Sequence, residues 1–362
     1  MKIGILTWSQ EVNHGAVLQT YAIYQSIIHL GHNPVVLDYQ ANDNNMDNML
    51  SKRIKRIFSR LRPDKLFIRY QLKEWTKDKS KLFETFRNRN LTMGCLYSDE
   101  PGLDKVVIGS DMVFDFYEGY NPFMYGKDVK CDYLFSYAAS FGYTTESIIE
   151  SYLKKDEIIK YIQKLKNVSF RDNNTGMILR NICGITNLVK AIDPVMLYGF
   201  CEERINWNKH KWAERKYILV YSYTYNMDDL AEIRAVKNYA KKHKLEIISV
   251  GYIHLWCDQS VNADPIEFVE LIQNAEIIIT DTYHGTIFSL TFEKQFIVII
   301  RNNAFKIVDI LSDLDLIETI NGTIEQKLQK IEYSPIDYKI VSKRIQKLRD
   351  ASMRFLSEQI NA

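Results

Sequence analysis

The sequence predicts an α/β protein built from two Rossmann-like domains, with parallel sheets facing a cleft. Domains usually have roughly 100–200 residues, so a chain of 362 residues is long enough for two. Strand and helix patterns alternate in two separate series, which is typical of parallel sheets. A polar, charged stretch at 207–216 lies between the two series. We therefore expect domains at 1–206 and 207–338, and a last helix at 339–362 that packs back across both.

The first series begins with a βαβ unit. An apolar strand at 2–7 is followed by a polar loop, a helix at 15–30 with apolar residues at helical spacing, and a C-cap at Gly31. A second strand follows at 35–37. Because such a unit joins parallel strands, the sheet is parallel. The later elements of this series are strands at 105–108 and 133–139 and helices at 145–165 and 172–181.

The second series is regular from Tyr217 onward. Strands are expected at 217–221, 246–250, 276–280 and 296–300, with helices at 228–243, 265–273 and 284–292. Ligands bind beyond the carboxyl ends of such strands, so a cleft between the domains is the expected site.

Charge is nearly balanced over the whole chain but not locally. There are 47 basic and 45 acidic residues, which argues against a whole-surface nucleic-acid binder. A basic helical insertion at 51–89 holds 14 Lys and Arg against 4 Asp and Glu. Its amphipathic part, 52–69, fits a solvated helix face, an anionic membrane surface or a pyrophosphate-bearing acceptor, and the membrane is slightly favoured.

The cysteines and the amino terminus indicate the compartment. Five widely spaced cysteines without a CxxC pair argue against a disulfide framework or a zinc site. The first ten residues turn polar too early for a signal peptide, and no apolar run is long enough for a membrane span. We therefore expect a cytoplasmic protein, peripheral to the membrane if the basic stretch binds it. No metal-binding motif is present, so no metal is expected.

Two candidate sites follow strands of the first domain. In the turn Asn13-His14-Gly15, glycine permits close approach and the free helix amides suit an anion, although Asn13 capping the helix is an equal reading. Ser110 and Asp111 follow the strand 105–108, where sheets build sites, but helix capping there is nearly as well supported.

The remaining candidates are cationic or titratable. Arg171 follows the short strand 168–170 and offers a planar fork for a carboxylate or phosphate, with a salt bridge as the alternative. His284 follows the strand 276–280, and a histidine there can transfer a proton or hold an anion. A buried structural histidine is the plainer alternative. Neighbouring candidates are Asp281, the amides of Gly285 and Thr286, and the cations Arg301 and Lys306.

Several motifs occur in family order over about residues 1–315. They are Lys2-Ile3-Gly4-Ile5-Leu6-Thr7 with Asn13-His14-Gly15-Ala16-Val17-Leu18-Gln19, Val107-Ile108-Gly109-Ser110-Asp111, Ser136-Tyr137-Ala138-Ala139-Ser140-Phe141-Gly142, Val168-Ser169-Phe170-Arg171-Asp172, Asp193-Pro194-Val195, and Thr280-Asp281-Thr282-Tyr283-His284-Gly285-Thr286. With these motifs the chain resembles the polysaccharide pyruvyl transferase family. The resemblance implies a GT-B-like fold and transfer of pyruvate from phosphoenolpyruvate onto a sugar as a cyclic ketal, with no cofactor besides that co-substrate.

The resemblance also implies roles for the candidate residues. His284 is the expected general acid/base or phosphate ligand, Arg171 the carboxylate clamp, and Lys306 a phosphate contact, while Asp281 orients His284. The acceptor would face Asn13, His14, Gly15, Ser110 and Asp111. Members with an Arg-Leu-His triplet have arginine where Thr282 stands here. One anion contact is therefore either absent or supplied from elsewhere, for which Arg301 is the candidate.

Two alternatives stay open from the sequence. One is a GT-B glycosyltransferase that uses a sugar nucleotide, because fold alone does not decide function. The other is a non-catalytic assembly protein at the membrane surface that uses the basic insertion. For the transferase, the acceptor is expected to be a saccharide of cell-surface polysaccharide biosynthesis, such as capsule or exopolysaccharide, with a polyprenyl-diphosphate-linked intermediate preferred.

Overall fold

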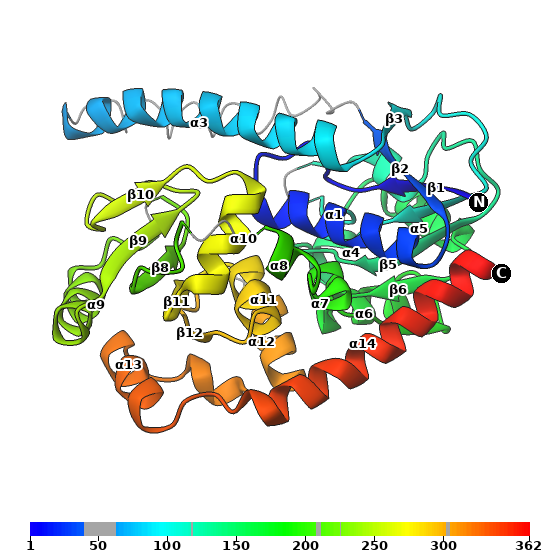
Figure 1. Ribbon diagram of the computed structural model, residues 1–362. Coiled ribbons are helices and arrows are strands. Elements are labelled where there is room, and N and C mark those ends of the chain that lie inside the picture. The colour runs from blue at the N-terminus through cyan, green and yellow to red at the C-terminus, as the bar shows by residue number, and fades with distance from the viewer. Residues whose placement is uncertain (40–62, 117–118, 208–210, 225, 302–304) are drawn as a thin grey trace.

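The computed structural model describes residues 1–39, 63–116, 119–207, 211–224, 226–301 and 305–362, and of residues 63–72 only the backbone. It contains two parallel sheets (Figure 1). The first has seven strands in the order β3-β2-β1-β4-β5-β6-β7 and the second has five in the order β10-β9-β8-β11-β12. We call each sheet with its helices a lobe.

The strands of the first lobe are β1 Lys2–Leu6, β2 Asn33–Asp38, β3 Met93–Leu96, β4 Lys105–Ile108, β5 Leu134–Ala139, β6 Val168–Phe170 and β7 Leu188–Lys190. Those of the second are β8 Tyr217–Tyr221, β9 Glu246–Val250, β10 Gln259–Val261, β11 Ile277–Thr280 and β12 Gln295–Val298. Central strands such as β4 and β8 are buried along their whole length, as expected for a parallel sheet covered on both faces.

The helices connect these strands as parallel crossovers require. In the first lobe they are α1 His14–His29, α3 Pro63–Asn90, α4 Glu146–Glu150, α5 Lys155–Lys164, α6 Asn173–Asn181, α7 Pro194–Tyr198 and α8 Glu203–Asn206. In the second they are α9 Leu230–His243, α10 Pro265–Asn274, α11 Tyr283–Thr291, α12 Phe305–Asp313 and α13 Ile324–Tyr333, and α14 Tyr338–Asn361 ends the chain. Short 3₁₀ turns lie at Pro122–Tyr125 and Ile317–Ile320.

The two lobes share one apolar core. A single cluster of buried side chains includes Ile5 and Val107 from the first sheet and Leu219 and Ile278 from the second. Apolar burial of this kind stabilises the contact between the lobes as it does a domain interior. The angle between the lobes is therefore set by packed side chains.

The last helix spans both lobes, from beside the second sheet to beside the first (Figure 1). Near its start the Tyr338 hydroxyl donates to the Lys294 carbonyl. Near its end the Gln359 carbonyl accepts from Lys105 at the start of β4. Helix α14 therefore ties the two lobes together on one side.

One expected helix differs from the structure, and one expected role is not tested by it. The helix expected over 145–165 is two helices, α4 and α5, separated at Ser151–Lys154. Ile149 at one end and Ile158 at the other are both buried, while Leu153 between them is exposed, so the chain turns to bury both. The basic insertion contains the long helix α3, but 51–62 lies outside the described residues, so the membrane role of 52–69 stays a prediction.

Candidate active site

A cavity of about 610 Å³ opens between the carboxyl ends of the two sheets. The first lobe supplies Trp8, Glu11, Asn13, Asp111, Asp115 and Tyr143, and the second supplies Tyr221, Tyr223, Asp281, Thr282, Tyr283, His284, Arg301 and Lys306. It therefore has the position, mixed polar and aromatic lining and size expected of a small-molecule site.

His284 lies in the first turn of α11, which Thr282 caps by accepting from the Gly285 amide. Its side chain is 13% exposed, and Nε2 lies 3.7 Å from Asp193 Oδ2. Burial lowers the pKa of His284 below its usual 6.5, and the nearby Asp193 and Asp111 carboxylates oppose part of that shift. The imidazole is consequently neutral at pH 7 and able to accept a proton.

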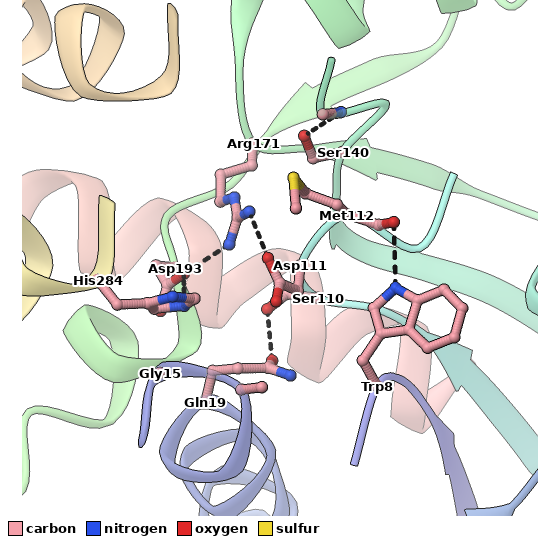
Figure 2. A network of polar contacts seen from close by, with 12 residues as sticks. Trp8, Gly15, Gln19, Ser110, Asp111, Met112, Ser140, Arg171, Asp193 and His284 are labelled. Atoms are coloured by element: carbon pink, nitrogen blue, oxygen red, sulfur yellow. Dashed lines mark hydrogen bonds and ion pairs between the residues drawn. The ribbon is translucent and has the colours of Figure 1, made fainter. Parts of the chain in front are cut away.

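A buried charge network stands behind His284 (Figure 2). Arg171 Nη1 donates to Asp193 Oδ2 at 2.8 Å, and Nη2 donates to Asp111 Oδ1 at 2.9 Å. Only 2% of the Arg171 side chain is exposed. The paired guanidinium holds the pKa of Asp111 well below its usual range, against the opposing effect of burial.

This network corrects the expectation that Arg171 clamps a substrate carboxylate directly. Both terminal nitrogens are already bonded to aspartates, and Arg171 does not line the cavity. The salt-bridge alternative is the one the structure contains, with Asp111 and Asp193 in place of the neighbouring Asp172. Asp193 was missed as a functional candidate, although its motif Asp193-Pro194-Val195 was singled out.

Lys306 on α12 is the cavity's cation without an acidic partner. Among the described residues it has no hydrogen bond or ion pair, and Nζ lies 5.5 Å from the Tyr283 ring centre. Burial, and next the charge of Arg171, lower the pKa of Lys306 to about 8. Lys306 is therefore mostly charged at neutral pH, with a pKa lowered as is common for groups at binding sites.

Arg301 lines the same cavity but is partly neutralised. Its Nη2 bonds Glu232 at 2.8 Å and the Asn226 carbonyl at 2.7 Å. Nη1 has no hydrogen-bond partner within the described part of the chain. Nε lacks a partner there as well, so Arg301 keeps two unpaired nitrogens.

Asp281 does not orient His284, contrary to expectation. Its Oδ2 accepts from Asn226 at 2.6 Å, and the carboxylate beside His284 is that of Asp193. The amides expected to face an anion are occupied as well. The Gly285 amide donates to Thr282 Oγ1, and the Thr286 amide donates to the Thr282 carbonyl, because Thr282 is the N-cap.

The acceptor residues expected in the first turn have different surroundings in the structure. Asn13 lines the cavity, and its side chain also caps α1 by accepting from the Gly15 and Ala16 amides. His14 is instead a core residue: its ring stacks on Phe268 at 4.4 Å and Nε2 lies 2.9 Å from the Ala263 carbonyl. The reason is that the first turn of α1 is buried, so the His14 side chain packs into the core, while Ala16 in the same turn borders the cavity.

Gly15 and Ser110 also face protein. Gly15 lies against the His284 ring, and Ser110 Oγ donates to Gln19 at 2.6 Å in a fully buried bond (Figure 2). Of the expected acceptor residues, Asn13 and Asp111 line the cavity. Glu11, which lines it too, was missed; burial and then Asp111 raise its pKa.

Two absences hold for the described residues alone. They contain no group of three His, Cys, Asp or Glu side chains placed to hold a metal ion. None of their helices combines the length and apolarity needed to cross a bilayer.

Sequence comparison decides the family. A model of the polysaccharide pyruvyl transferase family matches residues 13–303, four-fifths of the chain and all of the cavity's first-turn and His284 motifs. The chain belongs to the polysaccharide pyruvyl transferase family. A search of curated proteins finds no matching sequence.

Solved structures support the fold of this pyruvyl transferase family member. UDP-GlcNAc 2-epimerase from Neisseria meningitidis, bound to UDP-GlcNAc, is 11% identical with a TM-score of 0.54, over 99% of each chain. A UDP-forming alpha,alpha-trehalose-phosphate synthase from Burkholderia vietnamiensis is 7% identical with a TM-score of 0.50, over 100% of this chain and 99% of that one. These similarities confirm the GT-B-like arrangement of two Rossmann-like lobes, and at such identities they show the fold alone.

Proposed function

We propose that the protein transfers the pyruvyl group of phosphoenolpyruvate onto two hydroxyls of a saccharide, forming a cyclic ketal. Family membership supports pyruvyl transfer in polysaccharide biosynthesis. The observation that carries the proposal is that neutral His284, backed by Asp193, lines the same cavity as the unpaired cation Lys306. Proton transfer and anion binding are the two capacities that this reaction needs.

Lys306 and Arg301 are the proposed donor contacts. Phosphoenolpyruvate carries a phosphate and a carboxylate, and charge-assisted hydrogen bonds from ammonium or guanidinium groups hold such anions. We assign the phosphate to Lys306, the unpaired cation, and the carboxylate to the unpaired nitrogens of Arg301. Arg171 contributes through Asp193 and Asp111, which it holds in place.

The proposed reaction then proceeds in two stages. Neutral His284 accepts the proton of one saccharide hydroxyl, that oxygen bonds to C2 of the donor, and the imidazolium passes the same proton to C3, which becomes a methyl group. The second hydroxyl next attacks C2, the C2–O bond to phosphate breaks, and its proton leaves with inorganic phosphate. One hydroxyl proton thus ends on C3 and the other on phosphate. Asp193 stabilises the imidazolium that forms between these steps.

Thermal stabilisation of the purified protein by ligands tests the donor. Phosphoenolpyruvate should raise the unfolding midpoint, because a ligand that binds only the folded state stabilises it, and Lys306→Met should abolish the increase. Lys160→Met, which removes an exposed lysine of α5, is the matched control. Stabilisation by UDP-GlcNAc or a GDP-sugar, with none by phosphoenolpyruvate, would replace this proposal with a sugar-nucleotide glycosyltransferase.

A rate measurement tests the assignment of His284. With a saccharide acceptor identified by phosphate release, His284→Gln should lower kcat by about 10²–10⁴-fold, the usual contribution of a general acid–base group. Phosphoenolpyruvate should still stabilise this variant, because Lys306 and Arg301 remain. An unchanged kcat would remove His284 from the chemistry.

A further inference from the structure

The side chain of His284 belongs to the second lobe, but residues of the first lobe lie on two sides of its ring. On one side stands Gly15, at the first turn of α1. A Cβ added to Gly15 would lie 2.2 Å from His284 Nδ1, 2.3 Å from Cγ and 2.7 Å from Cβ. Side-chain carbons do not approach one another so closely, so the imidazole occupies the space that any larger residue at position 15 would fill.

Asp193 stands near the other ring nitrogen. Its Oδ2 lies 3.7 Å from His284 Nε2, while Oδ1 accepts from the Val195 amide at 3.0 Å as the N-cap of α7. The Asp193 side chain is fully buried and ion-paired with Arg171. Helix cap and ion pair together fix this carboxylate, so it is a rigid reference point for the ring (Figure 2).

The backbone at position 15 does not itself require glycine. Gly15 is not among the glycines with φ in the left-handed region, and it lies within a helix, where alanine is the more favourable residue. The contact with His284 is therefore the feature of this position that alanine would disturb. No hydrogen bond from Nε2 holds the imidazole in place, since this nitrogen has no hydrogen-bond partner among the described residues.

We propose that Gly15 and Asp193 are positioning residues that set the orientation of His284 across the boundary between the lobes. The reactive arrangement then exists only when the lobes pack as they do here, with α7 against α11 and the shared core intact. The inference deepens the proposed function, on which its rate measurements rest. It adds that the chemistry depends on how the two lobes pack against each other as well as on the groups that line the cavity.

The charges around His284 give the proposal a signature that folding defects do not produce. Asp193 and Asp111 raise the pKa of the imidazole, while Arg171 and Lys306 lower it, and burial lowers it most. Replacing Asp193 by asparagine keeps the shape and the acceptor oxygen for the Val195 amide. It removes one of the two groups that raise the pKa, so the pKa of His284 should fall further.

The first experiment compares two alanine variants by kcat and KM. In Gly15→Ala the ring must shift by about 1 Å, a displacement that can cost on the order of 10²-fold in rate, so kcat should fall by about that factor with KM for phosphoenolpyruvate unchanged. Gly176→Ala is the matched control. It is also a helical glycine whose added Cβ would meet an aromatic ring, Phe170, at 2.6 Å, but it is not at the cavity. Its kcat should be that of the wild type.

The second experiment needs no substrate. Imidazole NMR titration follows the seven histidines, with the His284 signal assigned by its loss in His284→Gln. The pKa of His284 should fall in Asp193→Asn and stay unchanged in Gly176→Ala. Wild-type kcat in Gly15→Ala, or an unchanged His284 pKa in Asp193→Asn, would overturn the proposal.

The two experiments also separate this inference from the proposed function. If the wild type releases no phosphate from phosphoenolpyruvate but the pKa of His284 still falls in Asp193→Asn, the positioning holds and the assigned reaction is wrong. If Gly15→Ala does not fold, the Asp193→Asn titration decides alone.

Discussion

Lys306 should set the alkaline limit of phosphoenolpyruvate binding. With a pKa of about 8, Lys306 is mostly charged at pH 7 and mostly neutral at pH 9. The donor's phosphate, with a second pKa of about 6, keeps its charge over this range. Affinity should therefore fall about tenfold between pH 7 and pH 9, since each unit above the pKa removes about nine-tenths of the cation. Isothermal titration calorimetry between pH 7 and pH 9 measures this change in the affinity for phosphoenolpyruvate.

Two substitutions locate the effect at this residue. Lys306→Arg keeps a charge up to pH 12, so the alkaline decline should disappear. At pH 7 Lys306→Met should bind about 10- to 100-fold more weakly than the wild type, because a hydrogen bond to a charged group contributes about 1.5–3 kcal/mol, and this difference should shrink by pH 9, where the wild-type lysine is itself mostly neutral. Lys160→Met should titrate as the wild type does. A decline that persists in Lys306→Arg would show that another group titrates and refute the assignment.

The remaining predictions concern buried ionisable groups. Removing the guanidinium in Arg171→Gln leaves Asp111 and Asp193 without their partner. The free energy of unfolding, measured in urea, should therefore fall by about 3–5 kcal/mol. A loss below about 1 kcal/mol, as for an exposed ion pair, would contradict the buried network. Burial, and next the charge of Lys79, hold the pKa of His14 well below 6.5, so the folded state binds fewer protons than the unfolded chain below pH 6.5. His14 should then cost about 1.4 kcal/mol of stability per pH unit on acidification below that value, a slope that His14→Phe should lose in urea titrations at pH 7 and 5.5.

The alternating pattern was enough to predict the fold. Strands at 105–108, 217–221 and 246–250 agree with the structure residue for residue, because buried strands of parallel sheets are continuous apolar runs that end at polar turns. The edge strands β3, β7 and β10 were not predicted. They have three or four residues each and are only partly buried, so their sequences carry little periodicity.

Missing β7 had a direct effect on the candidate site. Asp111 follows β4, Arg171 follows β6 and Asp193 closely follows β7, and these strands lie within four neighbouring positions of one sheet. Carboxyl ends of parallel strands share an edge, so the three charges meet there. Without β7 there was no reason to place Asp193 beside Arg171. The guanidinium consequently seemed free for a substrate.

The misassigned histidine shows a different limit. His14 and His284 both stand at the start of a helix that follows a parallel strand, next to a glycine, and sequence alone treats them alike. They differ because α1 is enclosed between the lobes, which buries His14 against Phe268 and presses Gly15 against His284. One short turn of the first lobe thus supplies both core packing and a wall of the site. Such a division of roles follows from the docking of two sheets, which no local pattern in either of them encodes.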